Sequence, residues 1–288
     1  MTDQLAEDGR LAISVRGLRK SYAGSPAVDG LDLDVRAGEV FALLGPNGAG
    51  KTTTVEILEG YRNRDAGEVT VLGVDPARAD QAWRARVGLV LQGTGEFDEL
   101  TVAEVVHHFA GFYPAPDDPV KVISRVGLDT KAKARTHTLS GGQKRRLDVA
   151  LGIIGRPELL FLDEPTTGFD PEARREFWEL IRDLAAAGTT IVLTTHYLEE
   201  AETLADRVGV IAGGRLIQVA TPAQLGDRQD ALATVSWRTP AGTVERAESA
   251  TPTALVADLA ARFGGEVPGL TVTRPTLEDV YLRMIGHR

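Results

Sequence analysis

The stretch "GPNGAGKTTT", residues 45–54, decides the fold of this 288-residue chain. Its first eight residues fit the pattern G-x-x-x-x-G-K-[ST] and follow the apolar run "EVFALL" (39–44), just before a segment with a helical pattern. In such a turn, backbone N–H groups point inward at a phosphate, and the helix N-terminus adds partial positive charge. Lys51 is predicted to reach the β- and γ-phosphates of a nucleotide, and Thr52 is predicted to bind Mg²⁺.

Two other interpretations of this turn are weaker. A glycine-rich connection between a strand and a helix can carry a lysine by chance, without any ligand. The overlapping "GPNGAG" (45–50) resembles a dinucleotide-binding fingerprint, but its spacing does not fit G-x-G-x-x-G. A nucleoside triphosphate is therefore the expected ligand.

Two adjacent carboxylates follow a second apolar run, in "ELLFLDEP" (158–165). Asp163 has the position expected for Mg²⁺ binding opposite the phosphate loop, and Glu164, one residue further, can accept a proton from an attacking water. A solvated acidic strand end is the alternative for the pair taken alone. A glycosidase pair does not fit, because adjacent strand residues point to opposite faces.

The order of the segments predicts an α/β fold. Unbroken apolar runs at 40–44, 87–91, 159–163 and 190–195 are typical of parallel strands covered on both faces, and helical patterns such as 171–188 lie between them. Residues 11–41 alternate apolar and polar, as in half-exposed antiparallel strands. A helical insertion is expected at about 96–155.

The last part of the chain, 230–288, predicts a small α+β unit. Its patterns indicate strands in "ATVSWRT" (233–239), "GTVERAE" (242–248) and "LTVTR" (270–274), and helices in "TALVADLAARFG" (253–264) and "LEDVYLRMI" (277–285). The apolar stripes on these helices need a surface to cover, and the strands at 233–237 and 270–274 are expected to supply it. We expect an accessory domain that contributes no residue to hydrolysis, after a main domain at 11–229.

Composition excludes several classes of protein. The net charge of −9 argues against a nucleic-acid-binding protein, and the lack of cysteine excludes disulfides and thiolate metal sites. The acidic start "MTDQLAEDGR" has no apolar core of a secretory signal, and no apolar run is long enough for a membrane span, so neither is expected. The histidines at 107, 108, 137 and 287 show no metal-ligand spacing and are expected on the surface.

A second glycine turn, "LSGGQKRRL" (139–147), opens another helix. Ser140 and the N–H groups of Gly141 and Gly142 form an anion site that has no lysine of its own. The basic residues 144–146 that follow are expected on a solvated face or at a partner contact. Such a turn is an incomplete phosphate site, which a second chain can complete.

With these two glycine turns and the carboxylate pair, the chain resembles the ATP-binding cassette (ABC) subunits of transporters, over roughly residues 11–225. "LSGGQ" matches the family's signature without a substitution. The resemblance implies a P-loop NTPase cassette with a mostly parallel core, an antiparallel β subdomain and a helical signature subdomain. It also implies ATP and Mg²⁺ as cofactors, and a head-to-tail homodimer in which each signature closes over the ATP of the other chain.

The resemblance assigns roles residue by residue. It implies nucleotide contacts from Tyr22, Gly45, Pro46, Asn47, Gly48, Ala49, Gly50, Lys51, Thr52, Thr53, Ser140, Gly141, Gly142, Gln143 and Asp170. It implies catalytic roles for Glu164, His196, Gln92 and Lys51, and metal ligands at Thr52, Gln92 and Asp163. Tyr22 matches the residue that stacks on adenine, and Asp170 lies in the loop that joins two cassettes, where Phe169 replaces the more usual Leu. Taken singly, Tyr22 could be a packing residue and Gln92 a polar residue at the end of a strand. A single histidine such as His196 would by itself not indicate a function.

Three classes of function compete: a transporter ATPase, a soluble ABC protein of translation or DNA repair, and a stand-alone P-loop kinase or GTPase. The last class does not need "LSGGQ", and the second resembles paired cassettes or cassettes split by a coiled coil. The stretch 196–225 and the ending "PTLEDVYLRMIG" resemble daunorubicin/doxorubicin-resistance-type exporters, which pair with a separate permease at the cytoplasmic face of the membrane and export drugs, lipids or polysaccharide. An importer is the alternative. The segment "GTGEFDELTVAEVV" (93–106), with an exposed Phe97, is expected to dock the permease.

Overall fold

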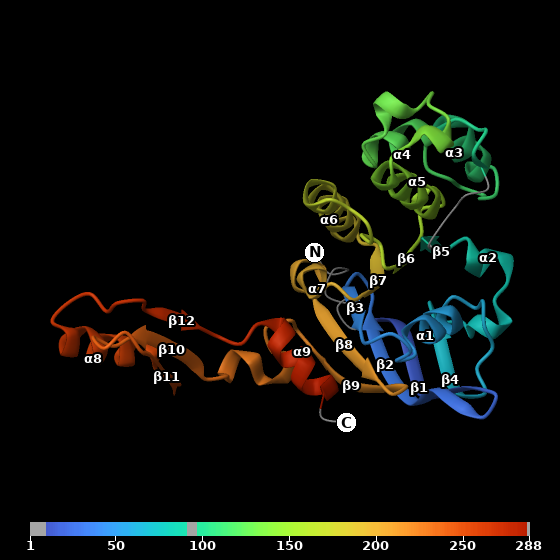
Figure 1. Ribbon diagram of the computed structural model, residues 1–288. Coiled ribbons are helices and arrows are strands. Elements are labelled where there is room, and N and C mark those ends of the chain that lie inside the picture. The colour runs from blue at the N-terminus through green and yellow to red at the C-terminus, as the bar shows by residue number, and fades with distance from the viewer. Residues whose placement is uncertain (1–9, 91–96, 287–288) are drawn as a thin grey trace, which may run out of the picture. The chain divides into compact units, whose positions relative to one another are not determined.

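The computed structural model describes residues 10–90 and 97–286 (Figure 1). The chain divides into two compact units, 1–219 and 220–288, ten residues before the boundary expected from the sequence. Within the described ranges, no helix is long and apolar enough to cross a membrane.

A six-stranded sheet forms the centre of the first unit, in the order β5-β6-β7-β3-β8-β9. The pairs β5–β6, β6–β7, β7–β3 and β3–β8 are parallel, which confirms the four predicted core strands. Their carboxyl ends therefore meet at one edge of the sheet, the edge at which α/β proteins bind ligands. The strands are β3 (Val40–Leu44), β5 (Val87–Val90), β6 (Leu159–Asp163), β7 (Thr190–Thr195), β8 (Arg207–Ala212) and β9 (Arg215–Ala220).

A separate antiparallel sheet has the order β2-β1-β4 and consists of β1 (Leu11–Tyr22), β2 (Ser25–Arg36) and β4 (Ala66–Val71). The alternation predicted for residues 11–41 is confirmed, because Ile13 and Val15 of β1 point into the core. They share a cluster with Phe41 of β3 and Phe161 of β6, so the antiparallel sheet and the central sheet enclose one core.

The predicted helical insertion is confirmed. Figure 1 shows its three α-helices gathered in one group, drawn in green. They are α3 (Val102–Ala110), α4 (Pro119–Arg125) and α5 (Gly141–Ile153), with the 3-10 turns η3 (Asp129–Lys131) and η4 (Thr136–Thr138). A capping box between Thr101 and Glu104 starts α3, as the polar residues there require.

The remaining helices of this unit connect the strands. They are α1 (Lys51–Leu58), η1 (Pro76–Arg78), α2 (Gln81–Arg84), α6 (Pro171–Ala186) and α7 (Leu198–Leu204). Asp170 caps α6, and Pro171 occupies its first turn, where the missing N–H costs nothing. The helix predicted at 171–188 is thus confirmed.

The second unit contains β10 (Ala233–Arg238), β11 (Val244–Ser249), α8 (Pro252–Phe263), β12 (Thr271–Thr273) and α9 (Leu277–Gly286), which confirms its predicted elements. Leu259 of α8 packs on Val235 and Trp237 of the sheet β11-β10-β12, as expected. The stripe on α9 instead packs on η5 (Leu225–Asp230), where a Cβ atom at Gly226 would lie 2.3 Å from Val280 Cγ1. The expectation that both helices cover strands is wrong for α9.

Candidate functional site

The phosphate loop connects the carboxyl end of β3 to the first residue of α1. A Cβ atom at Gly45 would lie 2.4 Å from the Ile211 carbonyl oxygen, and one at Gly50 would lie 2.3 Å from the Ala27 carbonyl oxygen. Gly50 also has φ 103°, a conformation that favours glycine. The glycines of the motif therefore let the loop curl tightly between β2 and β8.

Lys51 lies inside this loop. Its side chain is buried, and Nζ donates hydrogen bonds to the carbonyl oxygens of Gly45 (2.6 Å) and Pro46 (3.2 Å). Burial lowers the pKa of Lys51, while the carboxylates of Glu164 and Asp163 act in the opposite direction. The ammonium group is thus surrounded by loop carbonyls and within electrostatic reach of the two carboxylates. Thr52, the next residue of α1, is exposed, and Thr53 is half-buried.

Asp163 is the last residue of β6, and its neighbour on β7 holds its carboxylate. Thr194 Oγ1 donates to Asp163 Oδ1 at 2.5 Å. The backbone N–H of Glu164 donates to the Thr194 carbonyl oxygen at 3.1 Å. Thr194 was not among the predicted residues, although a hydroxyl at the end of the apolar run 190–195 was a signal for it. This threonine therefore orients both carboxylate residues.

Glu164 and His196 lie side by side at the same edge of the sheet. Glu164 has φ 43°, a left-handed conformation that is unusual for a side chain of this size and is often found at functional sites. His196 follows β7 directly, and its Nδ1 lies 3.4 Å from Glu164 Oε1. The imidazole packs on the Tyr197 ring at 4.1 Å between centroids. The structure thus brings Lys51, Asp163, Glu164 and His196 together.

The second glycine turn starts α5. Ser140 Oγ accepts a hydrogen bond from the Gln143 N–H (3.3 Å), and the Gln143 side chain accepts one from the Ser140 N–H (3.1 Å). This capping box leaves the Ser140 hydroxyl hydrogen able to donate to an anion. Ser140 and Gly141 are exposed, and a side chain on Gly141 would meet no atom within 4 Å. The turn is accessible from solvent.

Comparison with known proteins identifies the family. A profile of the ABC transporter family matches residues 28–167. The chain is 41% identical over 305 residues to Nod factor export ATP-binding protein I of Ralstonia nicotianae, with 95% of this chain and 94% of the relative covered. It is 38% identical over 303 residues to daunorubicin resistance ATP-binding protein DrrA3 of Streptomyces coeruleorubidus, with 96% of each chain covered.

The chain belongs to the ABC transporter family. It is an ATP-binding subunit of that family and an ATPase. Among solved structures, cbiO1 of Clostridium perfringens, part of an ABC transporter complex, is 27% identical with a TM-score of 0.70, covering 76% of this chain and 92% of its own. An ATP-binding subunit of another ABC transporter has the same TM-score and covers 95% of this chain and 99% of its own at 22% identity, which shows the fold.

The basic residues after the ABC signature correct one prediction. Lys144 is exposed, as expected of a solvated face, and Arg146 pairs with Glu176. Arg145 is instead buried, and its guanidinium donates to the carbonyl oxygens of Asp163 (2.6 Å) and Pro165 (3.1 Å). The prediction is wrong for Arg145 because α5 is buried on nearly all sides over 147–153, so this side chain reaches inward to the end of β6.

The other predicted residues of the ABC ATPase lie outside the group formed by Lys51, the carboxylate pair and His196. Tyr22 is exposed at the end of β1, with the Arg62 guanidinium 5.3 Å from its ring. Asp170 is an N-cap, and its carboxylate accepts from the N–H groups of Glu172 and Ala173. Gln92 lies outside the described residues. Phe97, expected to be exposed, is half-buried and packs edge-on against Phe109, because its backbone is held by the Thr136 hydroxyl.

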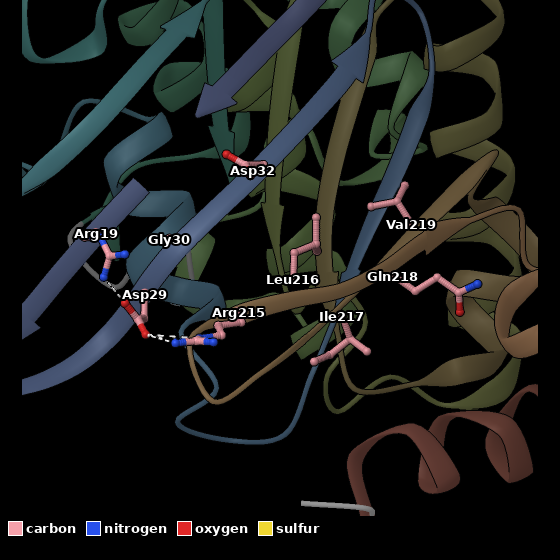
Figure 2. Close-up of a pocket in the computed structure, with 9 residues that line it drawn as sticks. All are labelled: Arg19, Asp29, Gly30, Asp32, Arg215, Leu216, Ile217, Gln218 and Val219. Carbon is pink, nitrogen blue, oxygen red and sulfur yellow. Dashed lines mark hydrogen bonds and ion pairs between the residues drawn. The ribbon is translucent and has the colours of Figure 1, made fainter. Parts of the chain in front are cut away.

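Figure 2 shows a pocket of about 450 Å³ formed by β1, β2 and β9 of the first unit. Arg19 and Arg215 both point at Asp29 and pair with it, and Asp32 accepts a hydrogen bond from the Gly17 N–H at 2.6 Å. Its charged side chains are therefore largely neutralised by one another. None of its lining residues belongs to the phosphate loop or to the carboxylate pair, so it is separate from the nucleotide site.

Proposed function

We propose that this ABC ATPase powers export through a separate membrane permease. One observation supports the proposal: Lys51, Asp163, Glu164 and His196, four of the groups expected to act in hydrolysis, gather at one edge of the sheet. The direction of transport follows the relatives in Ralstonia and Streptomyces, whose names describe an export protein and a drug-resistance protein.

The residues present suit Mg²⁺ as well as ATP. The Thr52 hydroxyl and the Asp163 carboxylate offer hard oxygen ligands, which Mg²⁺ prefers, and the Thr194 hydroxyl orients the carboxylate by donating to it. Thr52, Asp163 and Gln92 would hold the ion, which when bound neutralises charge on the phosphates. Lys51 and the N–H groups of Gly45 and of residues 47–53 would hold the phosphates themselves, with the Tyr22 ring against the adenine.

Glu164 is proposed to accept the proton of the attacking water. Its carboxylate lies beside His196 and also receives the Thr167 hydroxyl at 3.4 Å, so it is oriented from two sides. His196, exposed after β7, is proposed to donate to the terminal phosphate. Glu164 therefore removes the proton while His196 and Lys51 hold the group that is transferred.

The signature turn is proposed to complete the site of a second copy of this chain. Ser140, Gly141, Gly142 and Gln143 open α5 without any lysine, and Ser140 and Gly141 are exposed to solvent. A head-to-tail dimer would place this turn over the ATP of the other copy, with Asp170 in the loop between the two. The γ-phosphate then bridges Lys51 of one copy and Ser140 of the other.

The permease is proposed to dock beside the helical insertion, at the cytoplasmic face of the membrane. The expected docking segment begins at residue 93, of which 97–106 are described. A groove of about 600 Å³ adjoins it, lined by Tyr61, Phe109 and Tyr113 among others. Aromatic side chains are enriched where proteins bind a partner. Crosslinks from the permease's cytoplasmic helices to other surfaces would contradict this docking site.

The cargo is proposed to be a drug, an antibiotic or another hydrophobic compound. Daunorubicin resistance in the Streptomyces relative favours this class, and the Nod factor of the Ralstonia relative is the second candidate class. Because the ATPase carries no cargo site in this proposal, measuring transport with the permease encoded beside this chain decides between the two.

Glu164→Gln tests the assigned chemistry. The variant should bind ATP as the wild type does and lose most of its hydrolysis, because the phosphate loop is intact while the proton acceptor is gone. Glu172→Gln, in the exposed first turn of α6, is the matched control and should keep the wild-type rate. Hydrolysis by Glu164→Gln at the wild-type rate would show that the role belongs to another group.

A further inference from the structure

Tyr22, the residue proposed to lie against the adenine, carries two cations over its ring. The Arg62 guanidinium carbon lies 5.3 Å from the ring centroid, and Lys20 Nζ lies 5.7 Å from it. A cation within about 6 Å of a ring centroid is attracted to the π electrons of the ring. Tyr22 is 40% exposed, so part of its ring stays accessible to a flat ligand. Neither cation belongs to the groups proposed for hydrolysis.

The Arg62 guanidinium is held in place by Glu56. Its Nε donates to Glu56 Oε2 at 2.6 Å, and the Arg62 N–H donates to the Glu56 carbonyl oxygen at 3.0 Å. The pair is partly buried, with 34% of the Arg62 side chain and 23% of the Glu56 side chain exposed, so solvent screens it less than a fully exposed pair. Glu56 belongs to α1, the helix that begins with Lys51. Arg62 therefore connects the Tyr22 ring to the helix that follows the phosphate loop.

The loop between α1 and β4 also holds the backbone beside Tyr22. Asp65 Oδ2 accepts a hydrogen bond from the Ser21 N–H at 2.7 Å, and Asp65 Oδ1 pairs with Lys20 Nζ at 2.7 Å. The Asp65 N–H donates to the Arg19 carbonyl oxygen at 2.9 Å. Asp65 therefore fixes the backbone at the end of β1, but it does not fix the side-chain torsion angles of Tyr22.

We propose that Arg62 is a positioning residue for the adenine of ATP. Its guanidinium lies over the Tyr22 ring and restricts the rotation of that ring, which keeps the ring oriented for stacking on the base. Ordering a side chain before the ligand binds removes a cost of binding and so raises affinity. Because Glu56 holds Arg62 on α1, one helix joins the support of the base to the support of the phosphates. This inference rests on the role proposed above for Tyr22.

The test compares the binding of ATP and of inorganic tripolyphosphate to the full chain by calorimetry, with Mg²⁺ present. Tripolyphosphate carries the phosphates without the base, so it reports on the phosphate loop alone, and its binding also shows that a variant is folded. Arg62→Gln should raise the Kd for ATP about three- to fivefold and change the Kd for tripolyphosphate by less than about 1.5-fold, because only the support of the base is lost.

A double-mutant cycle tests whether Arg62 acts through the ring. Tyr22→Ala should weaken ATP binding at least as much as Arg62→Gln does. Adding Arg62→Gln to Tyr22→Ala should then change the Kd for ATP by less than about 1.5-fold, because the ring that Arg62 orients is gone. A further weakening as large as that in the wild-type background would show that Arg62 acts independently of Tyr22, and it overturns the proposal.

Arg64→Gln is the matched control in the same loop. Arg64 pairs with Asp75 at 2.8 Å and donates to the Gly67 carbonyl oxygen at 2.8 Å, so this variant removes the same charge from a different ion pair. It should lower the melting temperature and keep the Kd for ATP. A wild-type Kd for ATP in Arg62→Gln overturns the proposal, and so does an equal loss of ATP affinity in Arg64→Gln or an equal loss of affinity for tripolyphosphate in Arg62→Gln. If Tyr22→Ala binds ATP as the wild type does, the underlying role of Tyr22 fails; if Tyr22→Ala is weakened while Arg62→Gln is not, this inference alone fails.

Discussion

Glu59, directly after α1, is a carboxyl group whose pKa is strongly raised. Burial raises its pKa to about 8, and repulsion from Asp163 and Glu56 adds to the effect. Glu59 lines the groove beside the helical insertion together with Asp148 and Arg84. Between pH 4.5 and about 8 the folded chain therefore retains a proton that the unfolded chain has lost. The free energy of unfolding falls as the pH rises through this window.

Glu59→Gln should remove this pH dependence. We expect the variant to be more stable than the wild type by on the order of 1–3 kcal/mol at pH 8 to 9, and the difference to shrink steadily towards pH 4.5. Urea denaturation across this pH range measures it, with Glu68→Gln, an exposed carboxyl on β4, as the control. A difference that does not change with pH would show that Glu59 ionises normally in the folded chain.

At the scale of elements, α5 joins the signature turn to the end of β6. Ser140 starts this helix, and Arg145, a turn later, donates to the Asp163 and Pro165 carbonyl oxygens. The helix α5 therefore connects the signature turn to the carboxylate pair. A substitution at Arg145 should affect both of these parts of the site.

Arg145→Met should lower the free energy of unfolding by on the order of 2–4 kcal/mol, because it leaves buried carbonyl oxygens without their donor. ATP hydrolysis should fall as well, since the backbone that carries Asp163 loses a support. Lys144→Met, exposed on the same helix, should change neither quantity. Thermal unfolding and hydrolysis rates of the two variants give the comparison; equal behaviour would mean that Arg145 contributes little to the connection.

At the scale of the whole molecule, a shared nucleotide site predicts dimers that depend on ATP. Glu164→Gln should sediment as a dimer with ATP and as a monomer without it, because uncleaved ATP keeps both phosphate contacts occupied. Adding Ser140→Arg should weaken this dimer and leave ATP binding to the monomer intact. Thr130→Arg, exposed on η3, adds the same charge as a control. Glu164→Gln that stays monomeric at saturating ATP would exclude the shared site for the isolated subunit.

The second unit is predicted to support assembly and not chemistry. A chain ending at Val219 should keep ATP binding through Lys51 and lose stability, dimer formation or transport by the complex. A chain ending at Gln229 should be less stable than one ending at Val219, because it keeps η5 without the α9 helix on which η5 packs. Equal stability and transport in the truncated and full chains would contradict an accessory role. Loss of nucleotide binding by a folded truncated chain would extend the active site into 220–288.

Several features of this protein follow from the sequence by itself. The phosphate loop, four of the five parallel strands, the helical insertion and the elements of the second unit were all predictable, since each depends on a local pattern of apolar residues, glycines and capping groups. Lys51 and Asp163 could be assigned for the same reason, because a motif of a few residues defines them.

Only the tertiary structure decided how distant segments meet. Arg145 is charged and follows an exposed turn, yet it is buried because α5 packs against the end of β6. Thr194 stands in an ordinary strand pattern, and its importance comes from its contact with Asp163, more than thirty residues earlier in the chain. The stripe of α9 covers η5 and not a strand. Periodicity shows that a face is apolar, but packing across the whole chain selects what covers it.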